Sequence, residues 1–136
     1  MVRFLIRASG RRLAAFAVTM LVGIGAMAGA ARADGDPSNG GRLMNAKCST
    51  CHNWQPGGPN RIGPNLFGVV GRKAGTKEAF AYTDGMRSLG VVWSPELLAS
   101  YLAAPSKMVP GTKMTFPGLA DAKQAADVVA FLNTLR

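Results

Sequence analysis

The sequence predicts an all-α fold in which short helices are joined by long loops. Three segments carry helix signals, and no run of residues alternates long enough to predict a strand. Two loops are rich in glycine and proline, "QPGGPNRIGPN" (55–65) and "MVPGTKMTFPG" (108–118). Loops of this length in a small domain are normally functional or disordered. Because these loops and their neighbours also contain apolar residues, we expect them to wrap around something.

The first predicted helix runs from Pro37 to about Lys47. Asp36 is a suitable N-cap, and proline fits the first helical position because the missing N–H would have no partner there. The helix leads directly into Cys48, so it should position the side chain of that cysteine.

The second and third predicted helices each have an apolar face. The second runs from Pro95 to about Ala103 with Ser94 as its cap, and its face comprises Leu97, Leu98, Tyr101 and Leu102. The third runs from about Asp121 to Leu135, with a stripe of Ala125, Val128, Val129, Leu132 and Leu135. A short helical turn is also expected after Thr83.

Residues 1–33 read as a cleaved secretory signal peptide, which leaves residues 34–136 as a single domain. Four arginines precede an uncharged stretch over 13–31, and Ala31-Arg32-Ala33 resembles a small-x-small cleavage site. The stretch is also long enough to serve as an uncleaved membrane anchor, although its glycines and alanines dilute its hydrophobicity.

Removing the leader lowers the net charge from +9 to +4, because five of the 16 basic residues and none of the seven acidic residues lie in it. A nucleic-acid-binding domain of this size would show a denser basic stripe. A modest positive charge instead suits steering towards an acidic protein surface. The remaining chain has a single isoleucine and all eight prolines, so it is short of core residues.

The motif "CSTCH" (48–52) holds both cysteines and the only histidine of the chain. A zinc site normally needs four protein ligands when structural, or three and a water when catalytic, and the chain has no second Cys/His pair at zinc-finger spacing. A thioredoxin-like pair would follow a strand in a βαβ unit, which the sequence does not predict. A disulfide between Cys48 and Cys51 would close a very small loop and constrain little. The remaining interpretation is covalent haem attachment, with both cysteines bonded to the porphyrin and His52 bound to its iron. A haem would also supply the missing apolar core.

The sixth iron position then has no second histidine to fill it. Four methionines lie after the leader, and Met44 belongs to the helix that feeds into Cys48, so it is poorly placed to reach the opposite face. Spacing alone leaves Met108 and Met114 as close rivals, and an open position is a further possibility.

Several motifs together resemble those of the class I cytochromes c, which include mitochondrial cytochrome c and its soluble periplasmic relatives in bacteria. From about Gly40 to the C-terminus, the matching motifs occur in order and at matching separations: "CSTCH", "GPNLFGVVGRKAG", "FAYTD", "VVW" and "VPGTKMTFPG". The resemblance implies the cytochrome c fold, in which the first and last helices cross and loops enclose one covalent haem c. It also implies that Met114 is the sixth ligand.

Other roles are implied by the same resemblance. Pro64 matches a proline in the loop that holds the second nitrogen of the ligand histidine. Four residues match donors to the haem propionates: Arg72, Tyr82, Thr83 and Trp93. Tyr101 and Thr112 match groups that hydrogen-bond near the methionine sulfur, and Gly40 and Phe131 match the helix crossing.

The sequence departs from the mitochondrial pattern in three places. Met86 stands where a polar amide is usual, Phe67 replaces a histidine, and the basic residues around the haem edge are fewer. We can match Lys47, Arg61, Lys107 and Lys113 to that ring. Docking should therefore still favour acidic partners, with a weaker salt dependence.

The resemblance thus implies a monomeric, periplasmic electron carrier and not an enzyme. It would move single electrons from a membrane quinol-oxidising complex to an oxidase, a reductase or a photosynthetic reaction centre. Two alternatives stay open: a haem enzyme or gas sensor with an open sixth position, and a membrane-anchored subunit of an oxidase or dehydrogenase.

Overall fold

The computed structural model describes residues 35–136, and the predicted signal peptide lies outside the described residues. Five helices occur in this part: α1 (Pro37–Lys47), α2 (Asp84–Ser88), α3 (Pro95–Ala103), α4 (Pro105–Met108) and α5 (Ala122–Asn133). The only β pairing over 35–136 is an isolated antiparallel bridge between Lys73 and Val92. The predicted all-α class is confirmed.

The helices begin where their capping residues predict. The carboxylate of Asp36 accepts a hydrogen bond from the backbone N–H of Ser38 at 2.8 Å, and the Ser94 hydroxyl accepts one from the N–H of Leu97 at 3.1 Å. α5 is shorter than predicted, since Asp121 is its N-cap and Thr134 ends it. α4, which has no side-chain cap and only four residues, was not predicted from the sequence.

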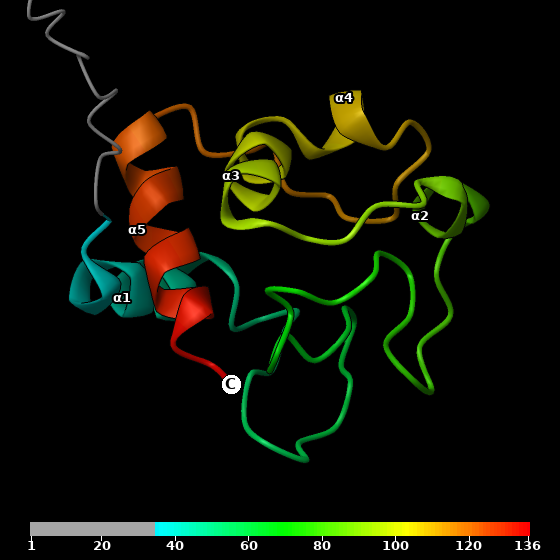
Figure 1. The fold of residues 1–136 in the computed structure, drawn as a ribbon, viewed down its shortest axis with the longest axis horizontal. Helices are drawn as coiled ribbons and strands as arrows, with labels where there is room; N and C mark the ends of the chain where they lie inside the picture. Colours follow the sequence, from blue (N-terminus) through cyan, green and yellow to red (C-terminus); the bar gives the residue numbers. More distant parts are fainter. Residues whose placement is uncertain (1–34) are drawn as a thin grey trace, which may run out of the picture. The chain divides into compact units, whose positions relative to one another are not determined.

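α1 and α5 pack against each other, and α3 packs on α5 (Figure 1). The crossing of α1 and α5 is possible because Gly40 has no side chain. A Cβ at that position would lie 2.0 Å from the carbonyl oxygen of Asp127 and 2.8 Å from the Cβ of Phe131. The predicted meeting of Gly40 and Phe131 is therefore present in the structure.

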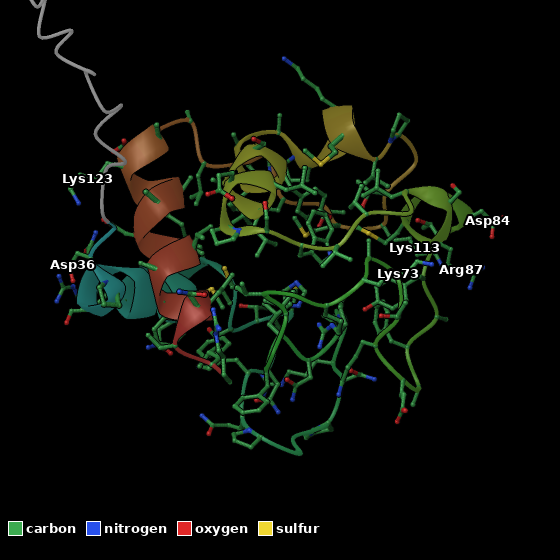
Figure 2. All side chains as sticks on the ribbon, in the orientation of Figure 1. Asp36, Lys73, Asp84, Arg87, Lys113 and Lys123 are labelled. Carbon is green, nitrogen blue, oxygen red and sulfur yellow. The ribbon has the colours of Figure 1, made fainter. Side chains whose placement is uncertain are left out.

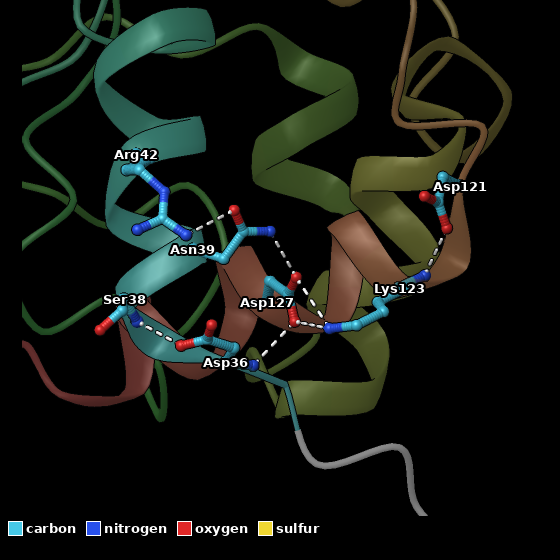
Figure 3. A network of polar contacts seen from close by, with 7 residues as sticks. All are labelled: Asp36, Ser38, Asn39, Arg42, Asp121, Lys123 and Asp127. Atoms are coloured by element: carbon cyan, nitrogen blue, oxygen red, sulfur yellow. Dashed lines mark hydrogen bonds and ion pairs between the residues drawn. The ribbon is translucent and has the colours of Figure 1, made fainter.

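A buried carboxylate ties α5 to the start of α1. Figure 2 shows Asp36 and Lys123 at the same end of the domain, and Figure 3 shows the contacts in detail. Asp127 is 0 % exposed. It accepts hydrogen bonds from the Asn39 amide at 2.7 Å, the Asp36 backbone N–H at 2.7 Å and the Lys123 ammonium at 2.9 Å. Together these donors lower the pKa of the Asp127 carboxyl to about 2, with Asn39 contributing most.

The long loops occupy the rest of the domain (Figure 1). The segment 48–83 is fastened to the segment before α3 by backbone hydrogen bonds. The Trp93 N–H donates to the Arg72 carbonyl at 2.9 Å, and the Ala74 N–H donates to the Val91 carbonyl at 2.8 Å. Arg72 and Trp93, distant in sequence, are thereby brought together. None of the helices within 35–136 has the length and apolar content needed to cross a membrane.

Candidate haem site

The "CSTCH" motif continues the C-terminal end of α1 as a tight turn. The Cys48 N–H donates to the Met44 carbonyl at 2.9 Å, and the His52 N–H donates to the Cys48 carbonyl at 2.8 Å. Cys48 and Cys51 are both free thiols and both half-buried. Burial raises the pKa of the Cys48 thiol, with the nearby Cys51 adding to this and Lys47 opposing it. The turn therefore presents two thiols and an imidazole from five consecutive residues.

The imidazole of His52 is held in one orientation. Its Nδ1 lies 2.8 Å from the carbonyl oxygen of Pro64. A carbonyl oxygen only accepts hydrogen bonds, so Nδ1 must carry the proton and Nε2 keeps its lone pair free. Burial lowers the pKa of His52, and the bond to Pro64 opposes this only in part. The neutral ring can thus bind a metal through Nε2.

Gly63 gives the imidazole its space. A Cβ at Gly63 would lie 2.3 Å from Cε1 of His52 and 2.7 Å from Nδ1. The Gly63 N–H donates to the Cys51 carbonyl at 2.8 Å, which keeps the loop pressed against the ring. Gly63 was not singled out from the sequence, although it lies directly before Pro64.

A cavity of about 510 Å³ lies next to the histidine. Its lining is mostly apolar and includes Leu98, Val128 and Leu132 from the helices. All eleven site residues predicted from the sequence line it: Cys48, Cys51, His52, Pro64, Arg72, Tyr82, Thr83, Trp93, Tyr101, Thr112 and Met114. An apolar cavity that is lined by two thiols, a neutral imidazole and a thioether fits a covalently attached haem in its lining and its donor chemistry.

The cavity separates the two methionine candidates that spacing left open. Met114 lines it and Met108 does not. The Tyr101 hydroxyl donates to the Met114 sulfur at 3.8 Å, and the Thr112 hydroxyl accepts from the Met114 N–H at 3.2 Å. Burial raises the pKa of Tyr101, and a hydrogen bond with Thr112 acts against this shift. Two other methionines, Met44 and Met86, also line the cavity.

Arg72 is held in place by the loop that follows Pro64. Its guanidinium donates to the Phe67 carbonyl at 3.0 Å and to the Asn65 carbonyl at 3.2 Å. Burial lowers the pKa of Arg72 and raises that of Tyr82, and the interaction between the two residues opposes both shifts. Polar donors of this kind suit buried carboxylates, such as propionates.

Thr83 and Trp93 complete this group. The Thr83 hydroxyl accepts from the Met86 N–H at 3.3 Å as the N-cap of α2, so its own proton is still available for donation. Trp93 is buried and its ring lies 5.0 Å from that of Tyr101, centroid to centroid. Asn65, which is buried and whose carbonyl accepts a hydrogen bond from Arg72, was not singled out from the sequence.

Comparison with known proteins agrees with this geometry. The Cytochrome c family profile matches residues 37–136. The chain is 44 % identical to cytochrome c of Theileria annulata over 100 residues, which cover 74 % of this chain and 86 % of that protein. It is 42 % identical to cytochrome c2 of Rhodopila globiformis over 102 residues, which cover 75 % of this chain and 95 % of that protein. It is 43 % identical to cytochrome c2 of Rhodoblastus acidophilus over 102 residues, which cover 75 % of this chain and 94 % of that protein. The chain therefore belongs to the cytochrome c family, and it is an electron-carrying protein with a covalently attached haem c.

Proposed function

We propose that His52 and Met114 are the two axial ligands of the haem iron. The observation that carries this proposal is that one cavity collects both side chains, each already oriented by a hydrogen bond. His52 offers Nε2 because Nδ1 is committed to Pro64. Met114 offers a sulfur lone pair while Tyr101 donates to the same atom.

This ligation would make the protein a carrier and not an oxygen-binding protein. With both axial positions filled by side chains, no position is left for oxygen or a substrate. A neutral thioether stabilises ferric iron weakly, so His/Met ligation raises the reduction potential. The coordination set need not change when the electron arrives, which keeps the reorganisation small.

We further propose acidic redox partners. The basic side chains of Lys47, Lys73 and Lys113 line the cavity, so they would surround an exposed edge of the haem. Figure 2 shows Lys73 and Lys113 on the α2 side of the domain. Of the four basic residues matched earlier, Lys47 and Lys113 line the cavity, whereas Arg61 and Lys107 do not. Such a surface would dock on an acidic face of a quinol-oxidising complex and then on an oxidase, a reductase or a photosynthetic reaction centre.

The proposed location is the bacterial periplasm, with a monomer as the working form. The support is the leader-like pattern of residues 1–33 and the similarity to the two cytochromes c2. Cell fractionation distinguishes this from the anchored alternative. A haem protein that starts near residue 34 in the periplasmic fraction supports the proposal, and an intact leader in the membrane pellet contradicts it.

The ligand proposal is tested by Met114→Ala, with Met108→Ala as the matched control. The haem protein is titrated electrochemically while its visible spectrum is followed, and the reduced form is then exposed to carbon monoxide. We expect the parent and Met108→Ala to show one single-electron wave and no carbon monoxide complex. Met114→Ala should lose the high potential and bind carbon monoxide. Binding of carbon monoxide by the parent protein would favour the open-site alternative.

A further inference from the structure

The peptide group between Pro64 and Asn65 is held at both of its polar ends. Its carbonyl oxygen lies 2.8 Å from Nδ1 of His52, and its N–H donates to Oδ1 of Asn60 at 2.8 Å. Because a peptide group is planar, fixing the N–H also fixes the direction of the carbonyl. A hydrogen bond at the N–H also polarises the group and makes its carbonyl a stronger acceptor. Asn60 therefore acts on the histidine through one peptide.

The side chain of Asn65 holds the loop around that peptide. It is 1 % exposed. Its amide donates to the carbonyls of Gln55 at 2.9 Å and Gly58 at 2.8 Å, and its Oδ1 accepts from the Phe67 N–H at 2.8 Å. All three partners are backbone groups on either side of Pro64. A buried side-chain amide that forms hydrogen bonds with all three backbone groups holds the loop in one conformation.

We propose that Asn65 is a positioning residue that sets the strength of the hydrogen bond from His52 to Pro64. The inference rests on the proposed role of His52 as an iron ligand. A ligand histidine that donates its second N–H strongly becomes a more basic ligand. Asn65 would thereby lower the reduction potential, because a more basic imidazole stabilises ferric iron.

The test replaces Asn65 by alanine in the haem-containing protein. Two properties are measured: the reduction potential, and the rate at which the Nδ1 proton of His52 exchanges with solvent in the reduced protein, followed by NMR. We expect Asn65→Ala to raise the potential and to speed the exchange roughly tenfold or more, because three hydrogen bonds that keep the loop closed are lost. A purely structural role would lower the stability without moving the potential.

Two further variants keep the test decisive. Asn60→Ala removes the acceptor at the far side of the peptide, at a half-buried residue, together with the hydrogen bond that the Asn60 amide donates to the Glu78 carbonyl at 3.0 Å. It should shift both readouts in the same direction by a smaller amount. Asn53→Ala is the matched control, because its amide contacts the same loop, at Pro59 and Gln55, but not the Pro64–Asn65 peptide. It should leave both readouts unchanged.

The outcomes separate this inference from the function on which it rests. If the parent protein has His/Met ligation but folded Asn65→Ala and Asn60→Ala match Asn53→Ala in both readouts, the positioning role is overturned. If Asn65→Ala does not fold, Asn60→Ala alone decides. If the parent itself lacks His ligation, the proposed function has failed, and this is seen before any variant is compared.

Discussion

Replacing Gly40 by alanine should destabilise the protein strongly, because α1 and α5 meet at this residue. The added Cβ would lie 2.0 Å from the oxygen and 2.6 Å from the carbon of the Asp127 carbonyl. Both are backbone atoms of α5, so neither can rotate away, and the two helices must separate. The hydrogen bonds of the Asp127 side chain would be disturbed by the same movement.

The neighbouring residue Gly41 gives a matched comparison. A Cβ there would lie 3.2 Å from Cε2 of the Phe131 ring, which can shift by a few tenths of an ångström. In both variants alanine raises the helix propensity, by about 0.8–1.0 kcal/mol. Overpacking costs about 1–3 kcal/mol, and the backbone clash places Gly40→Ala at the upper end. We therefore expect a net loss of about 2 kcal/mol for Gly40→Ala and a gain of up to about 1 kcal/mol for Gly41→Ala.

The assay is heat and guanidinium unfolding of the haem-containing parent and both variants, followed by far-ultraviolet circular dichroism. A difference of about 2–3 kcal/mol corresponds to melting temperatures that differ by roughly 8–24 °C in a domain of this size. Equal stability of Gly40→Ala and Gly41→Ala would refute the close crossing of α1 and α5.

Three further predictions concern the polar groups around the fold and the site. Asp127→Asn should flatten the pH dependence of the melting temperature in acid. The pKa of the Asp127 carboxyl is about 2 in the folded protein and about 3.9 in the unfolded chain. The carboxylate therefore stabilises the fold fully above about pH 3.9, and this stabilisation is lost as the pH falls through about 2. Tyr101→Phe removes the donor to the Met114 sulfur, which makes the sulfur a better electron donor to iron, so a redox titration should give a lower potential. Gly63→Ala should displace the ring of His52 and reduce the amount of haem protein with a low-spin spectrum, as measured by visible absorption.

Each of these predictions has its own control or contrary result. Asp84→Asn breaks an exposed ion pair with Arg87 and should hardly change the acid curve; an equal effect of both substitutions would contradict the role of the buried carboxylate. An unchanged potential in Tyr101→Phe would mean that its hydroxyl does not act on the sulfur. Gly41→Ala serves as the control for Gly63→Ala, and a normal yield and spectrum in both would contradict the close contact at the imidazole.

The sequence predicted the helices with clear start signals and missed the one without them. Asp36 and Ser94 cap helices that the structure confirms. α4 begins at Pro105 after an uncapped alanine, so it depends on tertiary packing that a local pattern does not reveal. The end of α5 was placed two residues too late because Leu135 continues the apolar stripe, although Thr134 already ends the helix.

The site was predictable to the extent that its residues carry recognisable chemistry. The "CSTCH" motif by itself predicts the cysteines and His52 as haem-binding residues, whereas spacing does not separate Met114 from Met108. The fold separates them, since only Met114 reaches the cavity. Asn65 and Gly63 were missed because their roles depend on backbone partners and on the space beside His52, which only the folded loop defines.

The most direct test of the central claim is the absorption spectrum of the ferric haem protein at neutral pH. With His52 and Met114 both bound to the iron, the spectrum should be low-spin and should show the weak far-red band of a methionine–iron bond. A high-spin spectrum without that band would contradict the account, because the sixth position would then be open to other ligands.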